Sequence, residues 1–177
     1  MSRAYHVAVA PLATARADVQ QQDHVCIEVG LLPILGEDTM RQLLLAELGR
    51  DGWTATPDGG RAWTSPDGLT ATMAPDGRTI TLTMTAARAV SAAARTQQEA
   101  DAAVHARADA AAAVVRREAT VALGRAEGDV RAAVDAALQR VYVEALQQKA
   151  RSLGQIESMQ RSESADGSVE LTIRVRA

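Results

Sequence analysis

The chain has 177 residues, enough for one domain with a sizeable core or for a small domain with an extension. Its formal net charge is -3, with 19 Lys and Arg against 22 Asp and Glu, so it lacks the basic surplus that is typical of nucleic-acid-binding proteins. Aromatic residues make up only 2% of the chain, and much of its 47% hydrophobic content is alanine. Because large side chains bury most core area, this composition favours an elongated helical protein over a compact globule.

The sequence also indicates where in the cell the protein is expected to be. Cys26 is the single cysteine, which excludes an internal disulfide and a zinc site built on several cysteines. The first residues lack the basic-then-apolar pattern of a signal peptide, and no stretch approaches the roughly 18 apolar residues that span a bilayer. Lys149 is the only lysine beside many arginines, which indicates a GC-rich bacterial genome. We therefore expect a cytoplasmic bacterial protein without a membrane span.

The first elements are expected to be two strands. Apolar and small residues alternate from Tyr5 to Val9 and again from Val25 to Val29, and this period of two is typical of half-buried strands. Pro11 is expected to end the first strand. The polar residues 13–22 between the two strands predict a loop.

A short helix is predicted over Glu37–Leu48. Met40, Leu43, Leu44 and Leu48 recur at helical spacing and form one apolar face, while acidic residues stand at the positive end of the helix. The segment Gly49-Arg-Asp-Gly52 is expected to end this helix.

Three Pro-Asp-Gly tripeptides follow at intervals of nine residues. Proline presets the first angle of a turn, and Asp and Gly tolerate the positive φ that such turns need. The spacing predicts an antiparallel meander of short strands. The expected strands are Trp53–Thr56, Arg61–Thr64, Leu69–Met73 and Arg78–Thr85.

Residues 86–153 predict a long helix, because they contain no proline and are dense in alanine, the strongest helix former. Gly124 and Gly128 lie near its middle and weaken a helix by roughly 1 kcal/mol each. Cap chemistry therefore favours a helical hairpin that folds back there, with Asp129 capping the second helix. A continuous rod remains the alternative.

The second half of this arm carries an apolar stripe that predicts a coiled-coil seam. Its members are separated by four, four, three and four residues, as in a heptad pattern. They are Val130, Val134, Leu138, Val141 and Ala145. An alanine-rich seam buries little area, so the arm is expected to pair with itself, with another copy or with a partner. Trp63 is a further candidate anchor for a partner, although a core position is the simpler interpretation.

The C-terminus predicts a hairpin. Val169, Leu171, Ile173 and Val175 alternate with polar residues after a turn around Asp166-Gly167, and Gln155–Arg161 is the expected partner strand. We expect this hairpin to complete the N-terminal sheet. The sequence therefore predicts an α+β fold: residues 1–85 plus 155–177 form a base domain with an antiparallel sheet and one short helix, and residues 86–154 form an inserted helical arm.

The chain carries few residues with recognisable chemistry. His6, His24 and His105 lack metal-ligand spacing, and the glycines match no phosphate-binding loop. Each Pro-Asp-Gly turn has one carboxylate, too few for calcium. His24 and Cys26 lie on the same face of one predicted strand, and an enzyme or ligand-binding protein using them is the least favoured alternative. We expect no enzymatic activity, no catalytic residues, no bound metal and no cofactor.

Two segments resemble a known family. The helix Leu138–Gly154, which contains Tyr142, leads into a strand and an Asp-Gly turn, and the helix Thr39–Leu48 is followed by Arg50-Asp-Gly-Trp53. Together they resemble the small family typified by the plastid and cyanobacterial reading frame ycf-thirty-five. The resemblance implies no enzymatic activity and no functional residues. It also implies an association with AAA+ ATPases, including bacterial systems linked to conflict with phage.

The resulting functional prediction is a non-catalytic interaction or assembly module. It is expected to act as an adaptor or subunit of a bacterial multi-protein system containing an AAA+ ATPase, with anti-phage defence among the systems that the resemblance implies. The seam is the expected contact, and an open sheet edge is the expected second site. A homo- or hetero-oligomer is expected, and nucleic acid is not an expected partner. The alternative is a coiled-coil protein that assembles only with itself.

Overall fold

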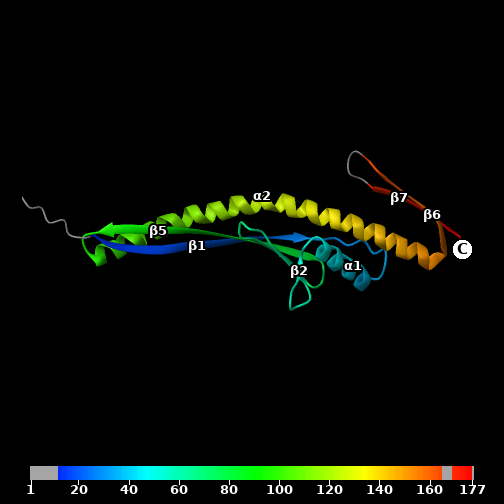
Figure 1. Ribbon diagram of the computed structural model, residues 1–177, viewed down its shortest axis with the longest axis horizontal. Helices are drawn as coiled ribbons and strands as arrows, with labels where there is room; N and C mark the ends of the chain where they lie inside the picture. Colours follow the sequence, from blue (N-terminus) through cyan, green and yellow to red (C-terminus); the bar gives the residue numbers. More distant parts are fainter. Residues whose placement is uncertain (1–11, 165–168, 177) are drawn as a thin grey trace, which may run out of the picture. The chain divides into compact units, whose positions relative to one another are not determined.

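The computed structural model describes residues 12–164 and 169–176. The elements in chain order are β1 (Ala13–Glu28), α1 (Glu37–Arg50), β2 (Thr54–Ala55), β3 (Arg61–Thr64), β4 (Leu69–Met73), β5 (Thr79–Ala94), α2 (Gln97–Leu153), β6 (Gln155–Glu163) and β7 (Val169–Arg176). Five strands form one sheet in the order β1-β5-β4-β3-β2, and β6 and β7 form a separate two-stranded sheet (Figure 1). The predicted α+β class is confirmed.

The Pro-Asp-Gly meander is confirmed, although its first strand β2 is shorter than the predicted Trp53–Thr56. Gly59, Gly68 and Gly77 adopt φ values of 93°, 86° and 70°, which glycine reaches without steric cost. Antiparallel pairing joins β2 to β3 and β3 to β4, with Trp63 opposite Ala71. Each turn therefore returns the chain directly into the neighbouring strand.

The predicted short helix is also confirmed, with α1 running two residues further than expected. Met40, Leu44 and Leu48 are buried, as the helical spacing of the apolar residues indicated. The helix ends because Gly52 turns the chain at a φ of 89°. The amide of Trp53 then donates to the carbonyl of Leu48 at 3.0 Å, which fixes the start of the meander against the end of α1.

Three predictions about the remaining elements are wrong. Residues 13–22 belong to strand β1 instead of a loop, and β5 continues to Ala94, so the long helix begins at Gln97 and not near residue 86. In both cases pairing between β1 and β5 overrides the local preference of polar and alanine-rich sequence. The β6–β7 hairpin forms its own sheet and does not complete the first one.

The helical hairpin expected at Gly124 and Gly128 is wrong as well, since α2 continues through both glycines (Figure 1). Asp129 is therefore an internal helical residue and caps nothing. Neither described helix has an apolar stretch that could cross a membrane. The strand predicted from Tyr5 to Val9, Pro11 and the turn at Asp166-Gly167 lie outside the described residues.

The chain divides into two compact units. The first comprises Met1–Asp23 and Met84–Ala122. Its core is built from small residues of β1, β5 and the first part of α2, with Ala15, Ala92, Ala100 and Val104 buried together. The helix is tied to the strands by Arg88, which donates to Glu118 at 2.6 Å, and by Thr120, which donates to Asp23 at 2.6 Å.

The second unit comprises His24–Thr83 and Leu123–Ala177. It holds the larger core side chains: Met40, Leu44, Leu48, Met73, Ile80 and Leu82 are almost completely inaccessible to solvent. In β5 the residues Ile80 and Leu82 are buried while the alternating threonines Thr79, Thr81 and Thr83 are partly exposed, as the alternation predicted. The candidate functional site lies in this unit.

Candidate partner-binding site

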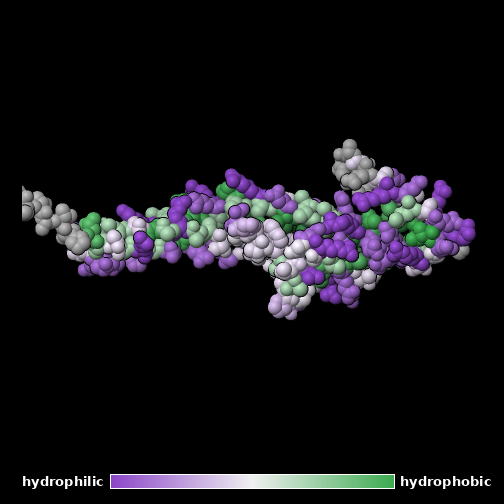
Figure 2. All heavy atoms as spheres, in the orientation of Figure 1, coloured by the Kyte–Doolittle hydropathy of each residue, from purple (hydrophilic) through white to green (hydrophobic). Residues whose placement is uncertain are grey.

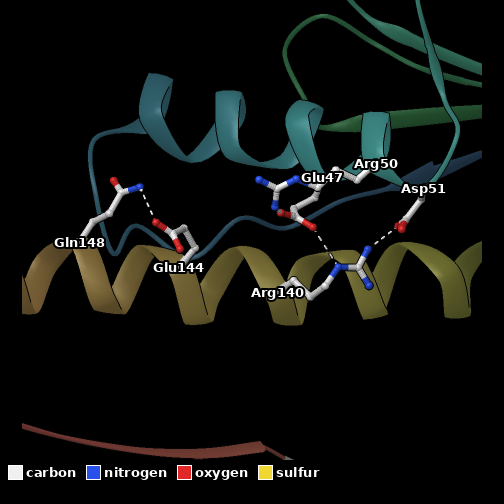
Figure 3. A network of polar contacts seen from close by, with 6 residues as sticks. All are labelled: Glu47, Arg50, Asp51, Arg140, Glu144 and Gln148. Carbon is white, nitrogen blue, oxygen red and sulfur yellow. Dashed lines mark hydrogen bonds and ion pairs between the residues drawn. The ribbon is translucent and has the colours of Figure 1, made fainter. Parts of the chain in front are cut away.

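A buried carboxylate joins the two helices of the second unit. Glu47 on α1 is 7% exposed and is the only buried charged residue among those the structure describes. It forms ion pairs with Arg50 on its own helix and with Arg140 on α2, whose Nε donates to Glu47 Oε2 at 2.9 Å (Figure 3). Because a buried charge is costly unless it is paired, this arrangement fixes the position of α1 along α2.

Arg140 also forms an ion pair with Asp51, the C-cap residue directly after α1. Its guanidinium group therefore bridges a buried and a half-exposed carboxylate. The hydrogen bond to Glu47, supported by the contact with Asp51, raises the pKa of Arg140 above its usual value. The arginine stays charged at every accessible pH. A change of pH therefore does not remove the positive charge that holds the two helices together.

Beside this bridge lies an open pocket of about 480 Å³. Its lining residues come from the turn after α1, from β3 and from one face of α2. They are Asp51, Trp53, Trp63, Asp129, Val130, Ala133, Ala136 and Arg140. The volume lies within the range of small ligand pockets and could accept a large side chain.

The local structure explains why the two tryptophans meet α2. Trp53 is anchored by its amide to the last turn of α1 and is 7% exposed. Trp63 lies two residues after Arg61 on β3, so both side chains point to the same face of the sheet. Arg61 donates to the carbonyl of Leu45 at 2.8 Å, which shows that this face is turned toward α1.

The α2 side of the pocket follows helical geometry. Asp129, Ala133, Ala136 and Arg140 recur at intervals of four, three and four residues, so they share one face. The two alanines leave space beside the indole rings. Asp51 and Arg140 pair with each other at one end of the pocket, whereas the carboxylate of Asp129 makes no hydrogen bond or ion pair within residues 12–164 and 169–176.

The structure brings together only two of the residues predicted from sequence to bind a partner. Trp63 and Val130 both line the pocket. Val134, Val141 and Ala145 are buried in the second unit, at 3%, 0% and 0% exposure, and Leu138 is half-buried. The stripe predicted as a coiled-coil seam is therefore engaged in packing within the chain.

Sequence reasoning missed Trp53, Asp51, Asp129 and Arg140. Asp129 was expected to cap a second helix, and Trp53 to begin a strand of the meander. The spacing of Asp129, Ala133, Ala136 and Arg140 was a visible signal in the sequence, but small residues between charges gave no reason to assign that face to a pocket. Only the packing of α2 beside the meander joins it to the two tryptophans.

The other candidate chemistry is dispersed. Cys26 is exposed on β1, and its sulfur lies 3.8 Å from the hydroxyl of Thr81. His105 is exposed on α2, and His6 lies outside the described residues. Within residues 12–164 and 169–176, no three His, Cys, Asp or Glu side chains are grouped so that they could hold a metal ion.

Comparisons with known proteins give one result. Neither the curated proteins nor the solved structures contain a significant match to the chain. The resemblance to the ycf-thirty-five family is not confirmed. One family model matches residues 1–177, the whole chain, and its description is FtsH ternary system domain X5. The chain therefore belongs to the family of FtsH ternary system domain X5.

Proposed function

We propose that the chain is a non-catalytic interaction subunit of a multi-protein system that contains an FtsH AAA+ protease. The observation that carries this proposal is the match of the family model over the full length of the chain. A ternary system implies that its components work together, and the expected association with an AAA+ ATPase agrees with the family description.

The geometry of the second unit supports a binding role. Glu47 and Asp51 are held by arginines, so these carboxylates serve the packing of α1 on α2 and are poorly placed to transfer protons. The adjoining pocket instead offers aromatic surface, which is enriched in the contacts that contribute most to protein-protein affinity.

Exposed apolar side chains supply further contact area on this unit. Leu32, Leu146, Leu153 and Met159 are 57%, 39%, 65% and 48% exposed. Figure 2 shows apolar surface among polar side chains over the last turns of α2. Larger exposed apolar surfaces often mark sites of protein association.

Affinity purification from the native cells tests the proposal. The tagged chain is recovered with and without ATP, and the captured proteins are quantified by mass spectrometry. We expect an FtsH-type AAA+ protease in amounts comparable to the bait, with recovery that depends on nucleotide. Recovery of the bait alone, as an oligomer of defined size, would contradict the proposal and favour a protein that assembles only with itself.

A further inference from the structure

The pocket beside the Arg140 bridge has an uneven charge balance. Among its lining residues, the two carboxylates of Asp51 and Asp129 stand against one guanidinium group, that of Arg140. That guanidinium group is already engaged by Glu47 and Asp51. Asp129 is the lining carboxylate that no cation of the described residues neutralises.

The two arginines that lie close to Asp129 in the sequence do not form an ion pair with it. Arg125 is one turn earlier on α2, yet no ion pair joins it to Asp129, and Arg131 pairs with Glu127 at 3.0 Å. Asp129 is exposed, so its carboxylate is hydrated and accessible from outside. The pocket thus combines two indole rings, two small alanines and an available negative charge.

These features fit one kind of occupant. A guanidinium group is planar, stacks on indole faces and pairs with a carboxylate through two parallel hydrogen bonds, whereas an ammonium group offers only a compact charge. An acidic or neutral side chain would leave Asp129 unpaired or would face like charge. The space left by Ala133 and Ala136 admits the aliphatic stem of a long side chain.

We propose that this pocket, defined by Trp53, Trp63 and Asp129, receives an arginine side chain from the protein partner. The inference rests on the proposed function, because it specifies the chemistry of the partner at this surface. Asp129 pairs with the incoming guanidinium group, and the half-buried Trp63 provides the aromatic surface on which it stacks, next to the buried Trp53. Arg140 positions the α2 face through its bridge to α1 and makes no contact with the partner.

The chain contains a built-in reporter for this binding. Trp53 and Trp63 are its only two tryptophans, and both line the pocket. Their intrinsic fluorescence is therefore measured during titration with two blocked tripeptides: acetyl-Gly-Arg-Gly-amide, and the same peptide with citrulline, a neutral analogue of similar shape. We expect saturable binding of the arginine peptide with a dissociation constant of about 1 mM, and at least about fivefold weaker binding of the citrulline peptide.

Substitutions on α2 supply the matched control. Asp129→Asn is expected to weaken the arginine peptide about fivefold, the effect of losing one exposed charge pair beside an aromatic surface. Asp135→Asn makes the same chemical change at an exposed position outside the pocket and is expected to leave binding unchanged. Equal binding of the arginine and citrulline peptides, an unaffected Asp129→Asn variant, or no binding at low salt would each overturn the assignment.

The outcomes separate this inference from the proposed function. If the AAA+ protease co-purifies with the chain and Asp129→Asn changes nothing, the pocket assignment fails and the function stands. If the peptide binds as expected but only the bait is recovered from cells, the pocket retains its arginine specificity and the assignment to that system fails.

Discussion

At the scale of single residues, the pair formed by Glu47 and Arg140 connects α1 to α2. Glu47 is nearly inaccessible to solvent, whereas 41% of the Arg140 side chain is exposed. Exposed ion pairs contribute little, but a buried carboxylate that loses a hydrogen-bonding cation must bear its desolvation cost. The pair therefore matters because of its buried partner.

Replacing Arg140 with Met should lower the free energy of unfolding by about 1–2 kcal/mol, because Arg50 remains to compensate Glu47 in part. Urea denaturation measures the change. Arg125→Met is the matched control on the same helix, where no ion pair is lost within the described residues, and it should stay within about 0.5 kcal/mol of the parent. An equal effect of the two substitutions would show that the bridge contributes nothing specific.

A second residue-scale effect concerns the first Pro-Asp-Gly turn. A hydrogen bond from the Thr56 hydroxyl, helped by the amide of Gly60, lowers the pKa of Asp58 below its usual 3.8. A carboxyl group whose pKa is lower in the folded state than in the unfolded state stabilises the fold at pH values above its unfolded-state pKa. This stabilisation is lost as the pH falls through the folded-state pKa. The turn is thus more stable with its carboxylate ionised.

Thr56→Val removes the hydroxyl and keeps the branched shape of the side chain. We expect the variant to melt at a lower temperature than the parent at pH 6. The difference should narrow as pH falls below 3.8 and through the lowered folded-state pKa of Asp58. Thermal melts followed by circular dichroism across that range measure it. A difference that stays constant with pH would mean that the hydroxyl does not act through the Asp58 charge.

At the scale of elements, α2 is one continuous helix. The helix passes through Gly124 and Gly128, and an added Cβ at either position meets no atom within 4 Å. Alanine is a much better helix former than glycine, and it also restricts the unfolded chain. The glycines are therefore tolerated within the helix at the expense of local stability.

Gly128→Ala should raise the free energy of unfolding by about 0.5–1 kcal/mol, and Gly124→Ala should do the same. Gly52→Ala is the opposite control: it too has open space around the added Cβ, but its φ of 89° strains any other residue, so destabilisation is expected. Urea denaturation of the three variants provides the comparison. Loss of stability on Gly128→Ala would indicate a turn at that position in place of a helix.

The elements were predictable where local chemistry decides them. Local turn preferences and residue periodicity predict three features that the structure confirms. They are the Pro-Asp-Gly turns, the apolar face of α1 and the alternation of Ile80, Leu82 and Met84. The strand character of residues 86–94 was not predictable, because Arg88, Ala89 and Val90 carry no local preference that outweighs alanine. Only pairing with β1 and packing against α2 within the first unit make them a strand.

At the scale of the whole molecule, the residues predicted to bind a partner also show what the sequence could not predict. The stripe from Val130 to Ala145 was recognised as apolar, and most of it is buried. The sequence could not distinguish burial within the chain from burial against a partner, because both demand the same side chains. The division of the chain into a base at residues 1–85 plus 155–177 and an arm at 86–154 stays a prediction.

As a subunit of an FtsH-containing system, the role that we propose, this chain should bind the FtsH AAA+ protease. Light scattering on a mixture of the purified chain and the purified FtsH AAA+ protease, with ATP present, tests it most directly. We predict a complex whose mass is the sum of both components in a fixed ratio, and a smaller fraction of complex with Asp129→Asn than with Asp135→Asn. Two separate species at every concentration, with the chain forming only its own oligomer, would contradict the claim.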